Sequence, residues 1–555
     1  MKYFYTLLVI VFFPFVLLAQ NNWDVVWTMD QKPFLDPRTD SEMAIVKAGF
    51  DTDQDGWGEF LCAWTDKEFN YILMYEASGD NTYDLVWYWE YPLPANSFAG
   101  IAVGDFDNNG LPEIVTTMPS IVNEDSPKRL WVFEWNGVQG ENKYGKGDEL
   151  GSITATNSWN FGLPNGIDFR PYGLTIEDID NDGKNELIVG VRSGDRGREI
   201  VIVRATGNLS GFGTFETEFS FQESFNGSLY NVTTGDLDND GNKEIYGLIW
   251  DQMTIRFFET TGADQYELVT SLDQVTPGVD YGALDAVRVA DVNNDGVNEM
   301  YIAGTEPDNT LFMVTNISDV SQITASDIVP FYKIPQQADG KLRSMQIADP
   351  DGDGNLDLMI AGEMNGQIFD LEYKGSGDPA DSSNWELSTI FDMFEYAPDT
   401  VGTLTPRLFY GSPAGDMDND GKQEYLFVNY RTSFPAWAED KYLWMIEIDQ
   451  VTDVETTVET IPNKIELLQN FPNPFNPTTN IGFNLSESGF VTLTIYDLLG
   501  KKVQTLVDKQ MNAGTHKVEF NAISLSAGTY FYELKVNSST NPNGFVQTKK
   551  LLLLK

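Results

Sequence analysis

The strongest constraint in this sequence of 555 residues is a nine-residue acidic loop that occurs seven times. The three clearest copies read Asp-x-Asp-Asn-Asp-Gly-x-x-Glu and occupy residues 178–186, 236–244 and 416–424. Looser copies begin at residues 51, 105, 291 and 349. Successive copies start about 61 residues apart on average, which indicates repeats of that size, stacked as an array or closed as a ring.

The residue type is fixed at the loop positions that offer oxygen ligands. Positions 1, 3 and 5 are Asp or Asn, position 6 is Gly and position 9 is Asp or Glu, whereas position 7 varies freely. Alternate carboxylates around a glycine turn, with position 7 giving only its carbonyl, are typical of a site for a hard cation. Calcium suits such flexible oxygen ligands better than magnesium does. The alternative is an ordinary metal-free turn, which Asp, Asn and Gly also favour.

The sequence therefore predicts up to seven structural calcium ions. The expected ligands are Asp51, Asp53, Asp55, Glu59, Asp105, Asp107, Asn109, Glu113, Asp178, Asp180, Asp182, Glu186, Asp236, Asp238, Asp240, Glu244, Asp291, Asn293, Asp295, Glu299, Asp349, Asp351, Asp353, Asp357, Asp416, Asp418, Asp420 and Glu424. A catalytic metal is not expected, because each loop uses its ligands internally.

The residues that follow each loop exclude a helix–loop–helix site. Position 12, which is the bidentate acid of an EF-hand, is never acidic, and position 10 is always apolar or aromatic. Short apolar runs such as 187–191 after a glycine turn are typical of buried strands. Together with the strand before the loop, each repeat supplies about four antiparallel strands, the size of a propeller blade.

The two ends of the repeat region predict a closed ring. Residues 24–27 (Asp-Val-Val-Trp) repeat the pattern of 84–87 (Asp-Leu-Val-Trp), so they resemble an outermost strand placed ahead of the first loop. The last repeat offers only two strands after its loop, at 425–429 and 442–448. We expect residues 23–29 to supply the missing edge strand. The predicted fold is all-β, with a seven-bladed β-propeller over residues 20–450.

Repeats such as 104–114 (Gly-Asp-Phe-Asp-Asn-Asn-Gly-Leu-Pro-Glu-Ile) resemble the FG-GAP/VCBS repeats of integrin-α-like β-propellers. The resemblance covers roughly 400 residues, although Phe50, Glu177, Ala290 and Ala348 replace the glycine before the loop. It implies that the loops bind calcium and hold the blades. It does not fix a function, because the family includes adhesins, lectins and polysaccharide-degrading enzymes.

Composition changes near residues 452–463. Residues 463–555 hold nine Lys, six acidic residues and no Trp, whereas the whole chain has 35 Lys and Arg, 84 acidic residues and 13 Trp. A proline-rich segment at 470–477 leads into alternating strands between 479 and 554, which predict a small Ig-like β-sandwich. The expected domains are a linker at 451–466 and this sandwich at 467–555.

The segments 470–479, 491–502, 527–534 and 547–555 resemble the type A sorting domain of the bacterial type IX secretion system. The resemblance implies that the secretion machinery is a partner, and that the domain is removed after the outer membrane of a Gram-negative bacterium is crossed. The product would be attached to the surface or released. An ordinary Ig-like adhesion module is the alternative.

The N-terminus predicts the first export step. Lys2, an apolar run at 3–18 and Ala19 form the pattern of a signal peptide at 1–19, with an uncleaved anchor as the alternative. No later stretch is long enough for a transmembrane helix.

Charge and composition narrow the function. A net charge of −49 opposes binding to nucleic acid or to anionic membranes. The single cysteine, Cys62, excludes an intramolecular disulfide, and the single histidine, His516, leaves little room for histidine chemistry. We expect a secreted or surface protein that binds a glycan or a protein without turnover, and we predict no catalytic residue. The alternative is a polysaccharide-active lyase or glycoside hydrolase, because paired carboxylates alone can hydrolyse glycosides.

Two long repeats suggest where a ligand binds. The spacings of 73 and 67 residues place extra sequence at 136–165 and 374–406. Insertions of this kind extend one face of a propeller, so Trp159 and Trp385 are the candidate ligand contacts. The alternative is that both segments are surface connections with no special role.

Overall fold

The computed structural model describes the chain in two units, Met1–Val451 and Thr452–Lys555, each of which is treated by itself. The described residues are 22–29, 42–65, 70–92, 99–118, 128–147, 151–164, 166–223, 227–251, 253–273, 281–306, 308–335, 340–363, 366–396, 407–430, 443–449, 464–468, 470, 473, 475, 477–486, 489–498, 500–511, 514–522, 525–538 and 544–554. The predicted signal peptide and most of the predicted linker lie outside them.

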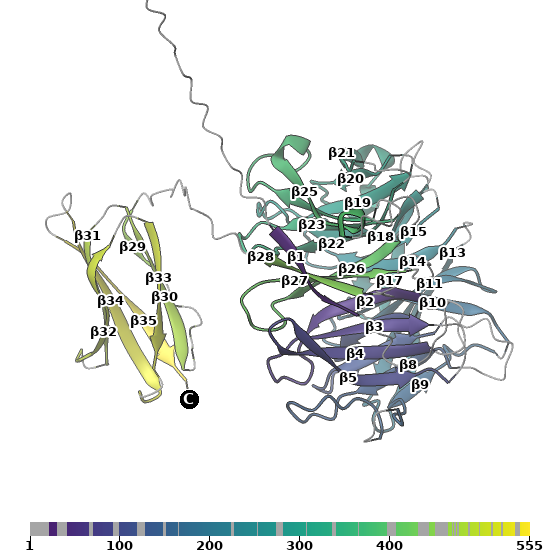
Figure 1. Ribbon diagram of the computed structural model, residues 1–555, viewed down its shortest axis with the longest axis horizontal. Coiled ribbons are helices and arrows are strands. Elements are labelled where there is room, and N and C mark those ends of the chain that lie inside the picture. Colours follow the sequence, from purple (N-terminus) through teal and green to yellow (C-terminus); the bar gives the residue numbers. More distant parts are fainter. Residues whose placement is uncertain are drawn as a thin grey trace, which may run out of the picture. The chain divides into compact units, whose positions relative to one another are not determined.

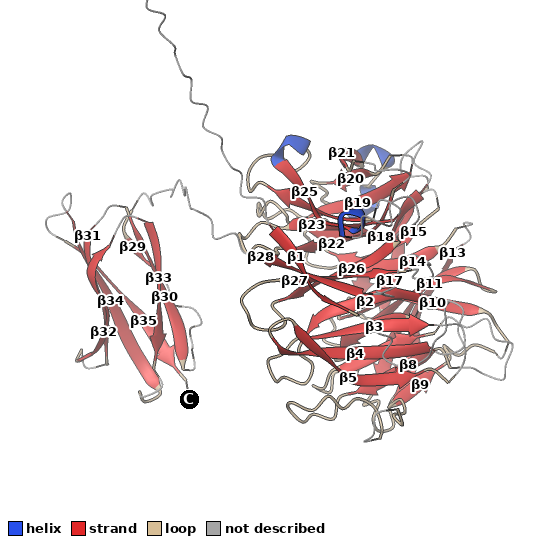
Figure 2. Cartoon of the chain, viewed as in Figure 1, coloured by secondary structure: helices blue, strands red, loops and turns tan. Residues whose placement is uncertain are grey.

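Regular structure in the first unit is almost entirely β-strand (Figures 1 and 2). The strands form sets of four antiparallel neighbours in chain order, here called sheets 1 to 6. Sheet 1 contains β2 (Glu42–Phe50), β3 (Glu59–Thr65), β4 (Asn70–Gly79) and β5 (Thr82–Glu90). Sheet 2 contains β6 (Gly100–Gly104), β7 (Glu113–Thr117), β8 (Leu130–Glu134) and β9 (Asn157–Trp159). Sheet 3 contains β10 (Phe169–Glu177), β11 (Glu186–Gly194), β12 (Arg198–Thr206) and β13 (Thr214–Glu223).

The following sets repeat this arrangement. Sheet 4 contains β14 (Leu229–Gly235), β15 (Glu244–Ile249), β16 (Thr254–Gly262) and β17 (Gln265–Leu272). Sheet 5 contains β18 (Tyr281–Ala290), β19 (Glu299–Glu306), β20 (Thr310–Val314) and β21 (Val329–Lys333). Sheet 6 contains β22 (Lys341–Ala348), β23 (Asp357–Glu363), β24 (Gln367–Tyr373) and β25 (Trp385–Asp392). One parallel bridge, Asp285 to Ser344, joins sheets 5 and 6. The one α-helix among the described residues, α1 (Met393–Tyr396), follows β25.

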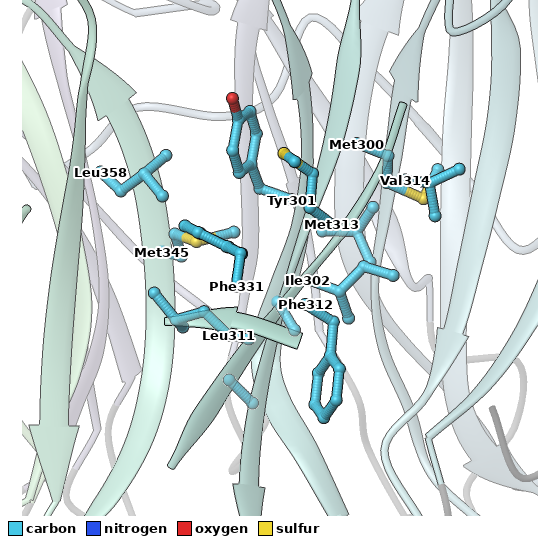
Figure 3. Close-up of a cluster of buried hydrophobic side chains, with 14 of the residues drawn as sticks. Met300, Tyr301, Ile302, Leu311, Phe312, Met313, Val314, Phe331, Met345 and Leu358 are labelled. Atoms are coloured by element: carbon cyan, nitrogen blue, oxygen red, sulfur yellow. The ribbon is translucent and has the colours of Figure 1, made fainter. Parts of the chain in front are cut away.

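Burial explains why the second strand of each set is so apolar. Every residue of β7, β15, β23 and β27 (Glu424–Asn429) is buried, whereas β13 exposes alternate side chains to solvent. The core lies between neighbouring sheets, as in the cluster where Met300 and Leu311 of sheet 5 join Met345 and Leu358 of sheet 6 (Figure 3). The repeats therefore stabilise one another through their faces.

The last set, sheet 7, includes the first strand of the chain. It contains β26 (Leu408–Gly415), β27, β28 (Leu443–Asp449) and β1 (Asn22–Thr28), and β1 pairs antiparallel with β28. The prediction that residues 23–29 complete the last set is confirmed by this pairing. Trp27 of β1 also packs edge-on against Phe60, Tyr75 and Tyr83 of sheet 1, with ring centroids 5.6 to 5.8 Å away. Sheets 1 and 7 are therefore neighbours.

The second unit has two sheets over one core. One contains β29 (Glu466–Leu467), β30 (Thr478–Leu485) and β33 (Gly514–Asn521). The other contains β31 (Gly489–Tyr496), β32 (Lys502–Met511), β34 (Gly528–Ser538) and β35 (Phe545–Leu553). Alternate residues of β30 are buried against Leu493 and Leu534, as expected for strands with one solvated face.

Among the described residues of both units, no helix has the length and apolar character needed to cross a membrane. Cys62 is buried in β3, and His516 of β33 packs against Phe483 with 5.3 Å between ring centroids. Both residues have the surroundings of structural side chains.

Trp27→Ala should destabilise the first unit by about 2 to 4 kcal/mol, because it removes an indole packed between the first and last strand sets. Asp24→Ala, an exposed position on the same strand, is the control and should change the free energy of unfolding very little. Urea unfolding of the two variants measures the difference. Equal stabilities would contradict a closing role for β1.

Candidate metal centres

All seven acidic loops adopt one backbone turn that gathers their carboxylates. They are loop 1 (51–59), loop 2 (105–113), loop 3 (178–186), loop 4 (236–244), loop 5 (291–299), loop 6 (349–357) and loop 7 (416–424). In every loop the position-1 carboxylate accepts the N–H of the position-6 glycine. The side-chain oxygen at position 5 accepts the N–H of position 7 at 2.7 to 2.8 Å. Each loop therefore joins the first and second strands of its set in the same way.

Two positions in each loop have left-handed backbone conformations. The position-6 glycines have φ between 87° and 96°, which glycine adopts without strain. Position 4 has φ between 56° and 72° in all seven loops, and is Asn in five of them, Gln54 in loop 1 and Gly352 in loop 6. Asn tolerates this conformation better than most residues. The left-handed conformation of position 4 was not predicted, although Asn recurs there in the sequence.

Position 9 places a carboxylate in the core at the start of the second strand. These seven residues are at most 2% exposed. In six loops the position-9 carboxylate accepts the N–H of position 2, as from Phe106 to Glu113 at 2.6 Å. Burial, as the largest cause, raises the pKa of Glu113 to about 9 and that of Glu186 to about 8. An ionised carboxylate here needs a compensating positive charge.

The residues fit a calcium ion. Oxygens of Asp236, Asp238, Asp240 and Glu244 lie within 4.8 Å of one another, and loop 7 repeats this arrangement. Buried oxygens of Asp107, Glu113 and Glu424 have no hydrogen-bond partner in the structure. Orphaned buried oxygens are costly, and a cation would satisfy them. The donor set of carboxylate, amide and backbone oxygens matches a hard ion.

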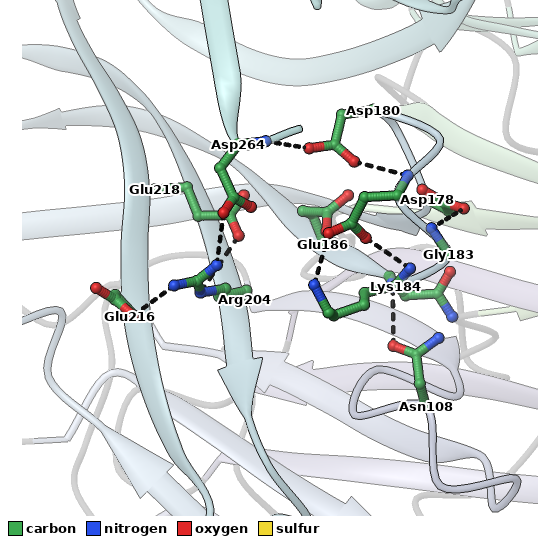
Figure 4. A network of polar contacts seen from close by, with 12 residues as sticks. Asn108, Asp178, Asp180, Gly183, Lys184, Glu186, Arg204, Glu216, Glu218 and Asp264 are labelled. Carbon is green, nitrogen blue, oxygen red and sulfur yellow. Dashed lines mark hydrogen bonds and ion pairs between the residues drawn. The ribbon is translucent and has the colours of Figure 1, made fainter. Parts of the chain in front are cut away.

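Basic side chains lie beside loops 3 and 7, and the surroundings of loop 3 are drawn in Figure 4. Arg204 of β12 lies opposite Glu186 in the strand register and forms ion pairs with Glu216 at 2.9 Å and Asp264 at 2.7 Å. Lys184 of the loop pairs with Asp182 at 2.6 Å. The seven loops are therefore alike in backbone but not in electrostatic surroundings.

Loop 6 departs from the others at two linked positions. Position 2 is Pro350, which has no N–H to donate, and position 9 is the shorter Asp357. Asp357 and Asp370 lie diagonally on one face of the β23–β24 pair, and one oxygen of each is buried without a partner. Burial raises the pKa of both carboxyl groups. Asp370 is a candidate ligand that the loop motif does not contain.

The loops also contact one another across the sheets. Asn185 of loop 3 donates its N–H to Asn108 of loop 2 at 2.8 Å, and Asn294 of loop 5 donates to the carbonyl of Gly354 in loop 6 at 3.1 Å. Asn419 of loop 7 donates to the carbonyl of Gly56 in loop 1 at 2.8 Å. The loop contacts thus pass from the last sheet back to the first.

Position 3 connects four loops to the hairpin of the following sheet. The carboxylates of Asp107, Asp180, Asp238 and Asp418 accept backbone N–H groups of Leu209, Asp264, Val320 and Asn81, respectively. The same carboxylates are predicted metal ligands. A cation that orders the loop would therefore also order the contact between neighbouring sheets.

The two predicted ligand contacts have most of their ring surface covered by protein. Trp385 is 3% exposed, donates its indole N–H to Pro379 at 2.9 Å and packs against Tyr301 and Phe331. Trp159 is half-buried and stacks on Phe215 with 5.6 Å between centroids. Both rings fill space between sheets, so neither forms an open platform.

A different aromatic cluster, which we call the aromatic–arginine cluster, lies at the strand ends opposite the acidic loops. Trp250 and Tyr281 stack with 4.6 Å between centroids, and Tyr230 meets Trp250 edge-on at 6.0 Å. The guanidinium of Arg192 lies over the Tyr230 ring at 4.8 Å, and that of Arg343 over Trp250 at 5.8 Å. Sequence reasoning missed this cluster because its members come from four different strand sets or their connections.

A buried polar network links the first strands of three neighbouring sheets. Asp285, which is 2% exposed, accepts hydrogen bonds from both terminal guanidinium nitrogens of Arg288, at 2.7 and 2.8 Å. It also accepts the side-chain amides of Asn231 and Gln346. This network joins β14, β18 and β22 and holds the first strands of three sheets together.

Two family models match the chain. The FG-GAP-like repeat matches residues 51–116 and 178–247, and the secretion system C-terminal sorting domain matches residues 469–550. The chain contains FG-GAP-like repeats and a C-terminal sorting domain. Both resemblances inferred from the motifs are confirmed. The sorting domain indicates export through type IX secretion, with release from the cell or attachment at its surface.

Among curated proteins no sequence match was found. Solved structures similar to this chain include the V. cholerae biofilm matrix protein Bap1, with a TM-score of 0.38, 13% identity, and coverage of 77% of this chain and 91% of that chain. Another is the exotype rhamnogalacturonan lyase YesX, with a TM-score of 0.37, 14% identity, and coverage of 78% and 74%, respectively. Similarity at this level does not define an activity.

Proposed function

We propose that residues 20–450 form a seven-bladed propeller stabilised by calcium, and that it binds an extracellular ligand without turnover. The sheets of four, the pairing of β1 with β28 and the contact from Asn419 to Gly56 support a closed ring. Up to seven calcium ions would occupy the loops, with the ligands predicted from the sequence. The observation that carries the metal assignment is the repeated burial of position 9 beside orphaned carboxylate oxygens.

Calcium should raise the melting temperature of the purified protein, because an ion that binds only the folded state stabilises it by about 2.7 kcal/mol per site at a hundredfold excess over Kd. Replacing Asp238 and Asp240 by Asn should reduce the calcium-induced rise, since loop 4 gathers four carboxylates. Glu90→Gln, at an exposed position of β5 at the strand end away from loop 1, is the control. Calorimetry in chelator and in calcium measures the effect, and identical melting curves in both would identify the loops as metal-free turns.

Export in two steps is the second part of the proposal. The signal peptide at 1–19 would be removed at the inner membrane of a Gram-negative cell, and the Ig-like sandwich at 467–555 at the surface. The match to the sorting domain over residues 469–550 supports this route. Mass spectrometry of the mature extracellular form should therefore detect no peptides beyond about residue 465, and intact C-terminal peptides in that form would contradict removal of the domain.

We place the ligand at the aromatic–arginine cluster. The rings of Tyr230, Trp250 and Tyr281 and the side chain of Arg192 are half-buried, so part of each is available at the strand ends away from the metal loops, whereas Arg343 is buried. Aromatic faces stack on sugar rings, and arginine donates paired hydrogen bonds to carboxylates. In a chain with a net charge of −49, Arg192 gives this cluster a local positive charge for an anionic group, while the buried Arg343 is paired with Glu363. An acidic glycan is thus the favoured ligand, with a protein as the alternative.

Trp250→Ala should weaken glycan binding about tenfold, because it removes the central ring of the cluster. Trp159→Ala is the matched control, since that ring packs internally against Phe215. Binding on an array of acidic and neutral glycans, with melting in calcium as a folding check, compares the two. Loss of binding in the Trp159 variant alone would show that the ligand binds instead at the long connection of residues 136–165. Release of reducing sugar by the purified protein would establish the enzymatic alternative.

A further inference from the structure

Loop 1 contains a buried carboxylate that has no partner. Asp53, at position 3, is 0% exposed, and neither of its carboxylate oxygens has a hydrogen-bond partner in the structure. The matching Asp180 and Asp418 of loops 3 and 7 each accept a backbone N–H from the following sheet. Two orphaned oxygens in one buried side chain cost several kcal/mol unless a cation satisfies them.

A carboxylate from outside the nine-residue motif points to the same place. Glu76 of β4 lies opposite Glu59 in the strand register. One oxygen each of Asp53, Asp55 and Glu76 lie within 4.8 Å of one another. Three converging oxygens from two elements form a site that the loop motif alone does not describe.

The long connection of repeat 2 covers this site. Residues 135–147, here called the cap, fold between β8 and β9, and Gly140 donates its N–H to the carbonyl of Asp53 at 3.0 Å. Asn142 donates its side-chain amide to Glu76 at 2.6 Å, and its own amide oxygen is buried without a partner. The hydroxyl of Tyr144 in the cap is hydrogen-bonded to the hydroxyl of Thr52 in loop 1. The extra sequence of repeat 2 therefore packs on loop 1.

Charge makes the arrangement dependent on an added cation. Within the described part of the chain, no ion pair involves Asp53, Asp55 or Glu76, in contrast to Asp182 of loop 3 with its Lys184 partner. At neutral pH the carboxylates repel one another beneath the cap.

We propose that a divalent cation of the calcium class is bound by Asp53, Asp55 and Glu76, and that it fastens the cap onto loop 1. The inference rests on the proposed calcium-binding function and extends it: one ion controls a contact between sheets 1 and 2. The amide oxygen of Asn142 is placed to complete the shell. The cap thereby accounts for part of the 73-residue spacing of repeat 2.

Terbium luminescence tests the site, because terbium replaces calcium and is sensitised by a nearby tryptophan. Trp57 is the only aromatic residue at position 7 of any loop, so Trp57→Phe identifies the share of the signal that comes from loop 1. Glu76→Gln in the full chain should weaken terbium binding at that site at least tenfold. Glu90→Gln, an exposed glutamate on β5, is the control and should match the wild type.

Hydrogen exchange of peptides covering 136–147 reports on the cap. Calcium should slow exchange there in the wild type and in the Glu90 variant, but not in the Glu76 variant. If the Glu76 variant keeps both the Trp57 signal and the calcium-dependent protection, the proposal is overturned, while a calcium-induced rise in melting temperature leaves the propeller function intact. If no variant responds to calcium in melting, both proposals fail.

Discussion

The structure of the repeat unit depends on carboxylates buried at the same point of seven successive strand sets. Each position-9 side chain enters the core at the start of a second strand, and in six loops it holds the backbone of position 2 by a hydrogen bond. The hydrogen bonds accepted at positions 1 and 5, which all seven loops share, form the turn that brings positions 1, 3 and 5 together. The same burial makes each ionised carboxylate unfavourable without positive charge nearby. The fold therefore creates a demand for cations as a direct result of how its turns are made.

The loops connect the sheets as well as the strands within a sheet. Asp107, Asp180 and Asp238 accept backbone N–H groups from the following sheet. Apolar packing between sheets is non-directional, but these hydrogen bonds are not, so they set the position of one sheet against the next. Binding of ions at the loops would consequently also stabilise the contacts between sheets.

Much of this structure was predictable, because the motif that forms each turn is local in sequence and occurs seven times. Seven copies of one acidic motif predict the turn, and the apolar run after each copy predicts a buried strand. The pairing of β1 with β28 followed from a strand missing in the last repeat. In contrast, the burial of Trp385 and the stacking of Trp250 on Tyr281 depend on contacts between repeats, which no local pattern records. The role of Glu76 was hidden for the same reason, since it lies one strand away from the loop that it completes.

The residue opposite position 9 distinguishes the loops from one another. The third strand places Glu76 opposite Glu59 and Glu447 opposite Glu424, but Arg204 opposite Glu186. Glu76 has no ion pair among the described residues, whereas Glu447 is paired with Lys422 of loop 7, and Arg204 is paired with Glu216 and Asp264 beside loop 3. One backbone turn thus supports loops with different needs for a cation. In loop 1 both oxygens of the buried Asp53 lack a partner and the cap of the neighbouring repeat lies against the loop, so exclusion of water there strengthens its attraction for an ion.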